Sequence, residues 1–270
     1  SLIKGSYSVR YPFLMSGGTK VSLTCSVNVT GNIKQQLFGD LFQMSMAEIQ
    51  QACKDGEIHQ FAHVGDTISD GTYTYTIIGI NQDKPSDANG NLLNSSKYGD
   101  VLTVMPLGAP TGAANGSPVT FNMSATPWGT TDVEQDDLTS TLTPYFEKLP
   151  KATQNVIGYV QKCTGAYDEH FSLTVLSTTG NRCFLLSSRE VFGSQGSNCC
   201  SSTEYNATFQ YQYFSDLAIT AESRNLYHNC WLLRSIHPSR GQHMYVYDGT
   251  TIDMGGWFRS GSFFPAFCIY

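Results

Sequence analysis

The residue types that could carry catalysis or hold a metal ion are present in this chain, but their arrangement favours neither. Six histidines are spread between positions 59 and 243, and we expect no metal site from them. A serine nucleophile would need a G-x-S-x-G turn between a strand and a helix, and the nearest stretch, GSQGS at 193–197, lacks that context. We therefore expect no catalytic residues, no metal and no cofactor.

The eight cysteines form the other reactive set. Those in apolar or strand-like sequence are Cys25, Cys53, Cys163, Cys183, Cys230 and Cys268, while Cys199 and Cys200 lie in a Gly/Ser-rich stretch. No C-x2-C pair occurs, so a zinc knuckle is not expected. In apolar surroundings a free cysteine behaves as a small hydrophobic residue. We expect mostly buried free thiols, with disulfides as the alternative.

The C-terminal third combines large aromatic rings with varied polar residues. In an expected strand over 243–247, Met244 and Val246 share one face, and His243, Tyr245 and Tyr247 share the other. Tyrosine and tryptophan are enriched at binding surfaces because their rings give large contact areas at low entropic cost. The pattern fits a binding face, and it fits core or sheet-edge residues equally well.

Composition excludes some partners. Charged residues make up 14% of the chain, below the roughly 25% of ordinary soluble domains. The net charge of −6 argues against a nucleic-acid partner, because phosphates require a basic face. No stretch approaches the ~20 apolar residues of a membrane span, so no membrane insertion is expected. The 270 residues suit one large domain, or a domain with a small appendage.

The elements that would position these residues are both helical and extended. The stretch VSLTCSVNVT (21–30) alternates strictly, which predicts a half-buried strand, and residues 1–40 are expected to form a small β appendage for attachment or oligomerisation before a main domain at 41–270. Ser45 and Glu48 form a capping box that predicts a helix closed by Gly56, and Thr131 with Glu134 predicts a second.

A further helix is expected to carry Val156, Ile157 and Val160. Strands are expected at 72–80, 171–178, 182–188, 244–249 and 263–270. Residues 81–100 read as a solvated loop; calcium binding by its Asp83, Asp87, Asn89 and Asn91 is the alternative. Together these elements predict an α+β fold.

Several linked motifs resemble those of a known family. In order they are MSMAEIQQACKDGEIHQFAHVGDT (44–67), TYTYTIIGIN (72–81), Trp128-Gly129, LPKATQNVIGYVQK (149–162), CFLLSSREVFGS (183–194), CWLLRS (230–235) and GSFFPAFCI (261–269). Over residues 44–270 the chain thereby resembles an uncharacterised domain of phage and prophage proteins from Gram-positive bacteria. The resemblance implies a C-type-lectin fold in its formylglycine-generating-enzyme-like form.

Members of that family are often variable target proteins of diversity-generating retroelements, which mutate surface codons near the C-terminus while the scaffold is kept. The resemblance therefore implies a structural frame and a ligand-reading face. The frame residues are Trp231, Leu233, Arg234, Pro265 and Phe267. The ligand-binding residues are His237, Ser239, Arg240, Gln242, His243, Tyr245, Tyr247, Trp257, Phe258 and Arg259.

Three functions follow from these patterns. The first is a non-enzymatic binding protein on a virion surface, or extracellular or on the cell surface if prophage- or host-encoded. It would recognise a bacterial surface protein or glycan, contact virion structural proteins, and could form homo-oligomers. The second is a virion decoration or tail protein that contacts neighbouring subunits through strand 21–30. The third is a thiol-dependent oxidase-like enzyme with Cys230 and Cys268 as its reactive pair.

Overall fold

The computed structural model describes a large part of the chain. The described residues are 5–14, 20–29, 44–106, 120–121, 142–143, 145–166, 175–193, 202–218, 220, 224, 231–236, 243–247, 251–254, 261–262 and 264–270. The helical elements are α2 (Met46–Lys54), α4 (Lys151–Gln154), α5 (Ser188–Phe192), α6 (Ser202–Ala207), the 3-10 helices η2 (Ile58–Gln60) and η3 (Ser95–Lys97), and the π-helix η4 (Tyr213–Leu217). The strands are β1 (Gly5–Leu14), β2 (Lys20–Val29), β3 (Thr67–Ser69), β4 (Thr74–Ile80), β5 (Leu102–Met105), β6 (Thr120–Phe121), β7 (Ile157–Gly158), β8 (Val160–Ala166), β9 (Val175–Asn181), β10 (Cys183–Phe184), β11 (Trp231–Ile236), β12 (His243–Tyr247), β13 (Thr251–Met254), β14 (Gly261–Ser262) and β15 (Ala266–Ile269).

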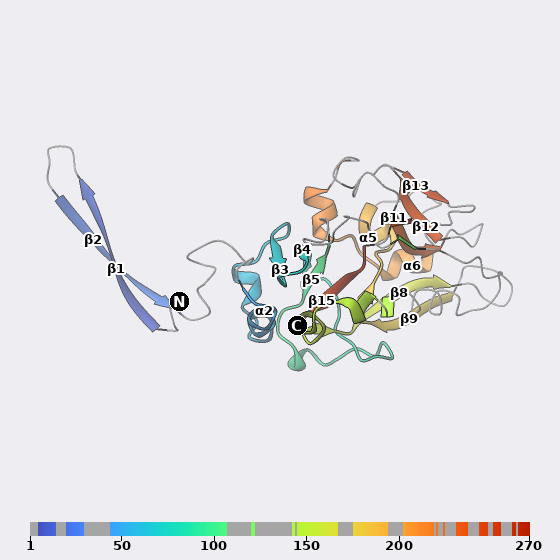
Figure 1. The fold of residues 1–270 in the computed structure, drawn as a ribbon, viewed down its shortest axis with the longest axis horizontal. Helices are drawn as coiled ribbons and strands as arrows, with labels where there is room; N and C mark the ends of the chain where they lie inside the picture. The colour runs from blue at the N-terminus through green and yellow to red at the C-terminus, as the bar shows by residue number, and fades with distance from the viewer. Residues whose placement is uncertain are drawn as a thin grey trace.

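Two sheets organise the main body of the molecule (Figure 1). The first runs β10-β15-β5-β4-β3, with β7 also paired to β15. The second runs β13-β12-β11-β14-β6, and β8 pairs with β9 in a separate ladder. The described pairings are antiparallel except for β11 with β14. Helices together with largely antiparallel sheets confirm the predicted α+β class.

The final strand, β15, is an inner strand of the first sheet. It pairs with β10, with β5 and with β7, so segments far apart in the sequence meet along it. All four of its residues are buried. Its alternating side chains therefore serve two cores: Phe267 and Ile269 face one, and Ala266 and Cys268 face the other.

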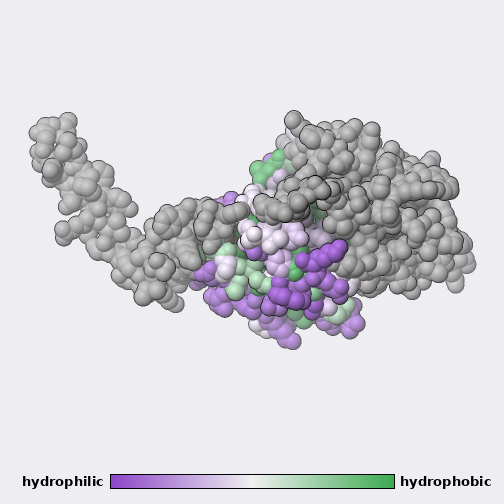
Figure 2. Space-filling view, in the orientation of Figure 1, coloured by the Kyte–Doolittle hydropathy of each residue, from purple (hydrophilic) through white to green (hydrophobic). Residues whose placement is uncertain are grey.

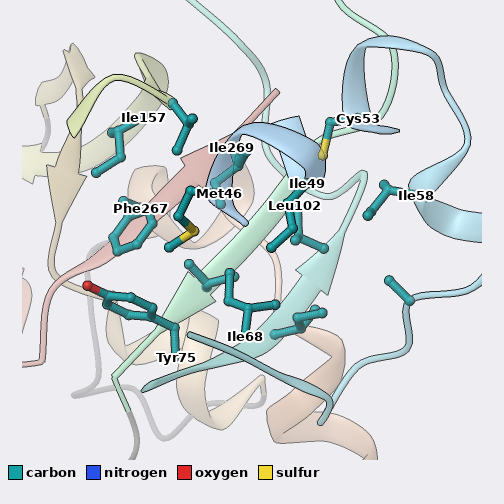
Figure 3. Packing of buried hydrophobic residues seen from close by; sticks show 14 of the residues in the cluster. Met46, Ile49, Cys53, Ile58, Ile68, Tyr75, Leu102, Ile157, Phe267 and Ile269 are labelled. Carbon is teal, nitrogen blue, oxygen red and sulfur yellow. The ribbon is translucent and has the colours of Figure 1, made fainter. Parts of the chain in front are cut away.

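Helix α2 covers one of these cores. Its capping box is present, since the Ser45 hydroxyl accepts from the Glu48 N–H and Glu48 Oε2 accepts from the Ser45 N–H at 2.9 Å. Gly56, at φ +66°, follows the last turn, where a glycine avoids Cβ strain. This confirms the helix predicted from Ser45. Figure 3 shows Met46 and Ile49 of the helix directed toward the strands that carry Leu102, Phe267 and Ile269.

The helix predicted around Val156, Ile157 and Val160 is wrong. Helix α4 ends at Gln154, and the chain turns into β7 and then β8. The β-branched residues there suit a pleated sheet, and pairing with β15 and β9 overrides the helical spacing.

Two further predictions need correction. The loop 81–100 is not simply solvated, because Asp83 and Asp100 within it are each only 6% exposed. Strand 182–188 shortens to β10, since Ser187 caps α5. The predicted helix beginning at Thr131 and Glu134 lies outside the described residues. Strand β5, buried at every position, was not predicted.

The N-terminal residues form a hairpin. Strands β1 and β2 pair antiparallel over their full length, which confirms the strand predicted at 21–30. Figure 1 draws this hairpin apart from the other described elements. The domain boundary at residue 40 remains a prediction.

The coloured part of the face drawn in Figure 2 is mostly polar. In the view of Figure 2, hydrophilic residues gather along the lower edge of the coloured surface and hydrophobic patches are small. Leu92 and Leu217 are the large apolar side chains exposed on the described body. Among the described helices, none combines the length and apolarity that a bilayer crossing requires.

Candidate functional site

Strand β11 is the inner support of the predicted binding face, and Trp231 fixes its start. The indole ring is 1% exposed. It stacks on Phe214 of η4 at 6.5 Å between centroids and meets Phe264 edge-on at 6.1 Å. Its Nε1–H donates to the Arg224 carbonyl at 3.1 Å, so the one polar atom of the ring is satisfied.

The remaining apolar frame residues are also in the core. Leu233 belongs to the same cluster as Trp231. Pro265, the residue immediately before β15, is also buried. Phe267 lies in the other cluster, where its ring meets Tyr75 edge-on at 4.9 Å. Strands β15 and β11 are thus held in place by packing of their side chains in the two cores.

Arg234 joins β11 to helix α5 through a buried ion pair. Its Nη2 donates to Glu190 Oε1 at 2.9 Å and its Nη1 donates to Glu190 Oε2, which is a bidentate arrangement. Nη1 also donates to the Leu185 carbonyl, and Nε donates to Thr164 Oγ1 at 3.2 Å. The guanidinium therefore ties together β11, β8 and the segment before α5.

Glu190 is kept ionised by its neighbours. Burial would raise the pKa of its carboxyl group, but the charges of Arg234 and Lys162 outweigh burial and lower the pKa from 4.5 to about 2. The same carboxylate accepts from the Ser187 N–H at 2.9 Å, which completes the capping box of α5. Glu190 thus starts a helix and neutralises a buried cation.

Lys162 is the second buried cation, and it is 3% exposed. Its Nζ donates to Asp83 Oδ1 at 2.5 Å, to Tyr211 OH at 2.8 Å and to Glu190 Oε1 at 3.2 Å. An ammonium has three protons, and each finds an acceptor here. The Nζ also stands 3.7 Å from the centroid of the Phe184 ring, a cation–π distance.

Asp83 closes this cluster. Its Oδ2 accepts from Tyr211 OH at 2.7 Å and from Thr103 Oγ1 at 2.6 Å. The two acids Asp83 and Glu190 balance Lys162 and Arg234, so the buried cluster is formally neutral. We call these four residues the charge cluster.

A third buried carboxylate, Glu204 of α6, contacts the end of β11. It accepts from the Ser235 hydroxyl and, through Oε2, from the Gly165 N–H at 2.9 Å. Burial raises the pKa of Glu204, and the Arg234 charge only partly offsets it. Consecutive residues Arg234 and Ser235 are therefore each fixed by an acid from a different helix.

The chemistry available to the charge cluster is structural. Its polar atoms are engaged with one another, and its members are at most 6% exposed. Such a network is costly to bury but holds one geometry, since losing a partner leaves an uncompensated charge. It fixes β11 against β8 and α5.

The register of β11 and β12 places the predicted contact positions. Trp231 pairs with Val246, so the two positions share a sheet face, the one whose tryptophan is buried. Alternation along β12 puts positions His243, Tyr245 and Tyr247 on the opposite face. The other predicted contacts lie outside the described residues: His237, Ser239, Arg240, Gln242, Trp257, Phe258 and Arg259.

The described cysteines do not resemble reactive thiols. Cys53, Cys183 and Cys268 are free and buried, and Cys163 is half-buried. Burial, followed by the nearby Asp83 charge, raises the pKa of Cys268 well above its ordinary value, which suppresses the thiolate. Its suggested partner Cys230 lies outside the described residues.

The described histidines and acids are engaged locally. His59 and His63 are four residues apart, a spacing that would share a face on an α-helix. Here His59 lies in η2, with its Nδ1 2.6 Å from Asp100, and His63 Nδ1 lies 3.5 Å from Asp66. Within the described ranges no group of three metal-ligating residues occurs.

The calcium alternative for loop 81–100 is also not favoured. Asp83 faces the charge cluster, while Asp87 accepts from the backbone N–H groups of Asn89 and Asn91. These loop carboxylates are directed to different partners, and Asp87 organises the turn itself.

The sequence reasoning missed Lys162, Glu190 and Tyr211, and it named Asp83 only as a possible calcium ligand. One signal was available: Ser187 and Glu190 are spaced as a capping box before an apolar pair. No local signal predicted that Lys162 and Asp83 are buried, because the two partners are 79 residues apart in the sequence.

Comparison with known proteins gives one match. Residues 117–270 match the family model described as a domain of unknown function, DUF6273. No curated protein and no solved structure matches the chain. The matched region begins after β5, although β5 pairs directly with β15 inside it.

Proposed function

The chain belongs to the DUF6273 family of domains of unknown function, and from that premise we propose that it is a non-enzymatic binding protein of a phage or prophage particle. The body would be a C-type-lectin-like domain, and the five-stranded sheet around β11 would present its ligand-reading face. The observation that carries the proposal is the register of β11 with β12. It puts position 246 on the same sheet face as the buried Trp231, so that positions 243, 245 and 247 lie on the other face.

The internal supports favour this use of the sheet. Arg234 and Ser235 anchor β11 through Glu190 and Glu204, so these two attachments of the strand do not involve the predicted contact positions. A face that contributes little to stability can change its residues freely. That separation is what a variable target protein of a diversity-generating retroelement requires.

The proposed partners are a bacterial surface protein or glycan on one side and virion structural proteins on the other. The binding face would combine Tyr245 and Tyr247 with Trp257, with polar residues such as Arg240 around them. Affinity would come from aromatic anchors on a rigid scaffold, without a metal. The protein would stand on the virion surface.

The first prediction concerns the double variant Tyr245→Ala with Trp257→Ala. We expect capture of the fluorescently labelled protein by intact Gram-positive cells to fall ~tenfold or more, because aromatic anchors dominate binding free energy. The melting temperature should change by less than ~2 °C. Flow cytometry and thermal unfolding measure the two effects, and arrays of surface glycans and proteins then identify the ligand.

The matched control is Tyr98→Ala, which removes a half-buried ring that packs against Tyr270 away from β12. This control should retain capture. If the double variant loses stability as strongly as capture, the two rings belong to the core and the proposed face is wrong.

The retroelement part of the proposal is tested in DNA. A reverse-transcriptase gene beside a near-copy of the codons for residues 231–269 is the expected arrangement. A genome that encodes this chain without such a near-copy would remove variability from the proposal and leave the binding function to be judged by the cell assay.

A further inference from the structure

The β1–β2 hairpin divides its residues sharply between two faces. The register pairs odd-numbered positions with odd-numbered positions along its whole length, from Gly5 with Val29 to Phe13 with Val21. Directly paired positions share a face, so odd positions form one face and even positions form the other. The odd face holds three aromatic residues, five aliphatic residues, one cysteine and one glycine. We call it the odd face.

The even face is mostly polar. It carries serines, a threonine and an asparagine, together with both charged residues of the hairpin, Arg10 and Lys20; its apolar positions are Pro12 and Leu14, near the turn. The odd face therefore carries no charge at all. A charge-free apolar face opposite a mostly polar one is the pattern of a sheet with one side in water and the other against a hydrophobic partner.

Among the described elements, nothing extends this sheet. β1 and β2 form a two-stranded sheet to which no further described strand is paired. A lone two-stranded hairpin is at best marginally stable in water, and a hydrophobic face on it needs to be covered. The stability of the hairpin therefore depends on what covers the odd face.

We propose that the odd face is covered by the odd face of a second copy of this chain. Two hairpins would pack face to face about a two-fold axis as a four-stranded sandwich, with the sheets ~10 Å apart. The face can meet itself without electrostatic repulsion, because the positive charges of Arg10 and Lys20 lie on the even face.

The area of the odd face suits this occupant. Enclosed aromatic residues bury roughly 150–250 Å² each, so Tyr7, Tyr11 and Phe13 supply roughly 450–750 Å². The aliphatic residues bring the face to the order of the ~800 Å² per partner found in stable complexes. Homodimer interfaces are also the class richest in apolar surface.

This inference stands apart from ligand recognition. It assigns residues 5–29 to pairing, whereas the proposed contacts lie between 237 and 259. A dimer would present two binding faces to one bacterial surface and thereby raise the effective concentration of the second face.

The test compares two double variants of the full chain by sedimentation equilibrium. Tyr11→Lys with Leu23→Lys places two charges at a directly paired site on the odd face. Ser8→Lys with Ser26→Lys places the same two charges at a directly paired site on the even face. Both change the net charge from −6 to −4, so they match in added charge and differ in the face they modify and in the side chains they remove.

We expect the wild-type chain and the even-face variant to sediment as dimers of the 29.7 kDa chain. The odd-face variant should sediment as a monomer at the same concentration, with a dissociation constant raised at least 100-fold. The thermal unfolding of the main body should be the same in all three proteins.

Three results would overturn the proposal. A monomeric wild-type chain would mean that another partner covers the face, and a trimer would contradict the two-layer arrangement. Equal effects of the two variants would show that the face is not the interface. Cell capture by the monomeric variant is measured separately, so loss of pairing and loss of ligand recognition remain distinguishable.

Discussion

At the scale of single residues, the charge cluster determines how β11 is held. Lys162 and Arg234 are both almost fully buried, and each contacts Glu190. Asp83 and Tyr211 complete the hydrogen bonds of the ammonium group. Because every partner comes from a different segment, the cluster links β11, β8, α5 and the loop after β4 through polar atoms rather than through apolar packing alone.

The variant Lys162→Met should lower the free energy of unfolding by about 3–5 kcal/mol, the usual cost of breaking a buried ion pair from one side. Asp83 would be left buried without its cation. Urea denaturation measures the change. Lys151→Met, at an exposed position of α4, is the control and should stay within about 0.5 kcal/mol of wild type. If both variants change the free energy of unfolding by a similar amount, the charge cluster does not stabilise the fold as proposed.

The pH dependence of stability should reveal the lowered pKa of Glu190. Its pKa is lowered to about 2 in the folded chain from 4.5, so its stabilising contribution is complete above pH 4.5 and is lost as the pH falls toward 2. Unfolding of Glu190→Gln, measured across this range, should differ most from wild type at neutral pH. The difference should shrink in acid.

Glu204 supplies the opposite control. Burial raises its pKa, so its contribution is present at low pH and is lost as the pH rises through the folded value. The difference between wild type and Glu204→Gln should therefore move in the reverse direction with pH. Parallel curves for the two variants would contradict the assigned environments.

At the scale of elements, strand β9 depends on close contact with the loop after β4. A Cβ built on Gly180 would lie 2.0 Å from the Asp87 carbonyl oxygen, which is backbone and cannot rotate away. Gly180→Ala should therefore destabilise the chain by about 2–3 kcal/mol. Gly71→Ala has a positive φ but open space, so it should cost about 1 kcal/mol. Thermal unfolding compares them, and an equal cost would rule out the clash.

Local signals in the sequence predicted some elements well. The capping box at Ser45 and Glu48 marks the start of α2 because both of its hydrogen bonds form within four residues. The alternation in 21–30 marks β2 because one strand contains the whole pattern. An element can be predicted from the sequence when the pattern that defines it lies wholly within that element.

Other elements depend on distant partners. Strand β5 is buried on both faces, so it has no alternation to reveal it. Residues 157–160 pair with β15 and β9, and those contacts override a helical spacing. The burial of Lys162 likewise follows from Asp83, 79 residues away. The predicted contact residues around β12 stay predictions.

At the scale of the whole molecule, two regions divide the work that we propose. The β1–β2 hairpin has a charge-free face, and the main body carries its own two cores around β15. Because the described residues of the two cores all lie at or after Met44, we expect pairing through the hairpin and stability of the body to vary independently.

The position of β15 also dictates when the body can form during synthesis. Residues 266–269 are made after every strand that they separate, and β10, β5 and β7 have no neighbour on that side until they arrive. At ~5–20 residues per second, the ribosome holds these open strands for many seconds before closure. A stop codon just before Phe264 would leave β10, β5 and β7 without their pairing to β15. Such a shortened chain would be bound by chaperones or degraded by proteases and would not form a working protein.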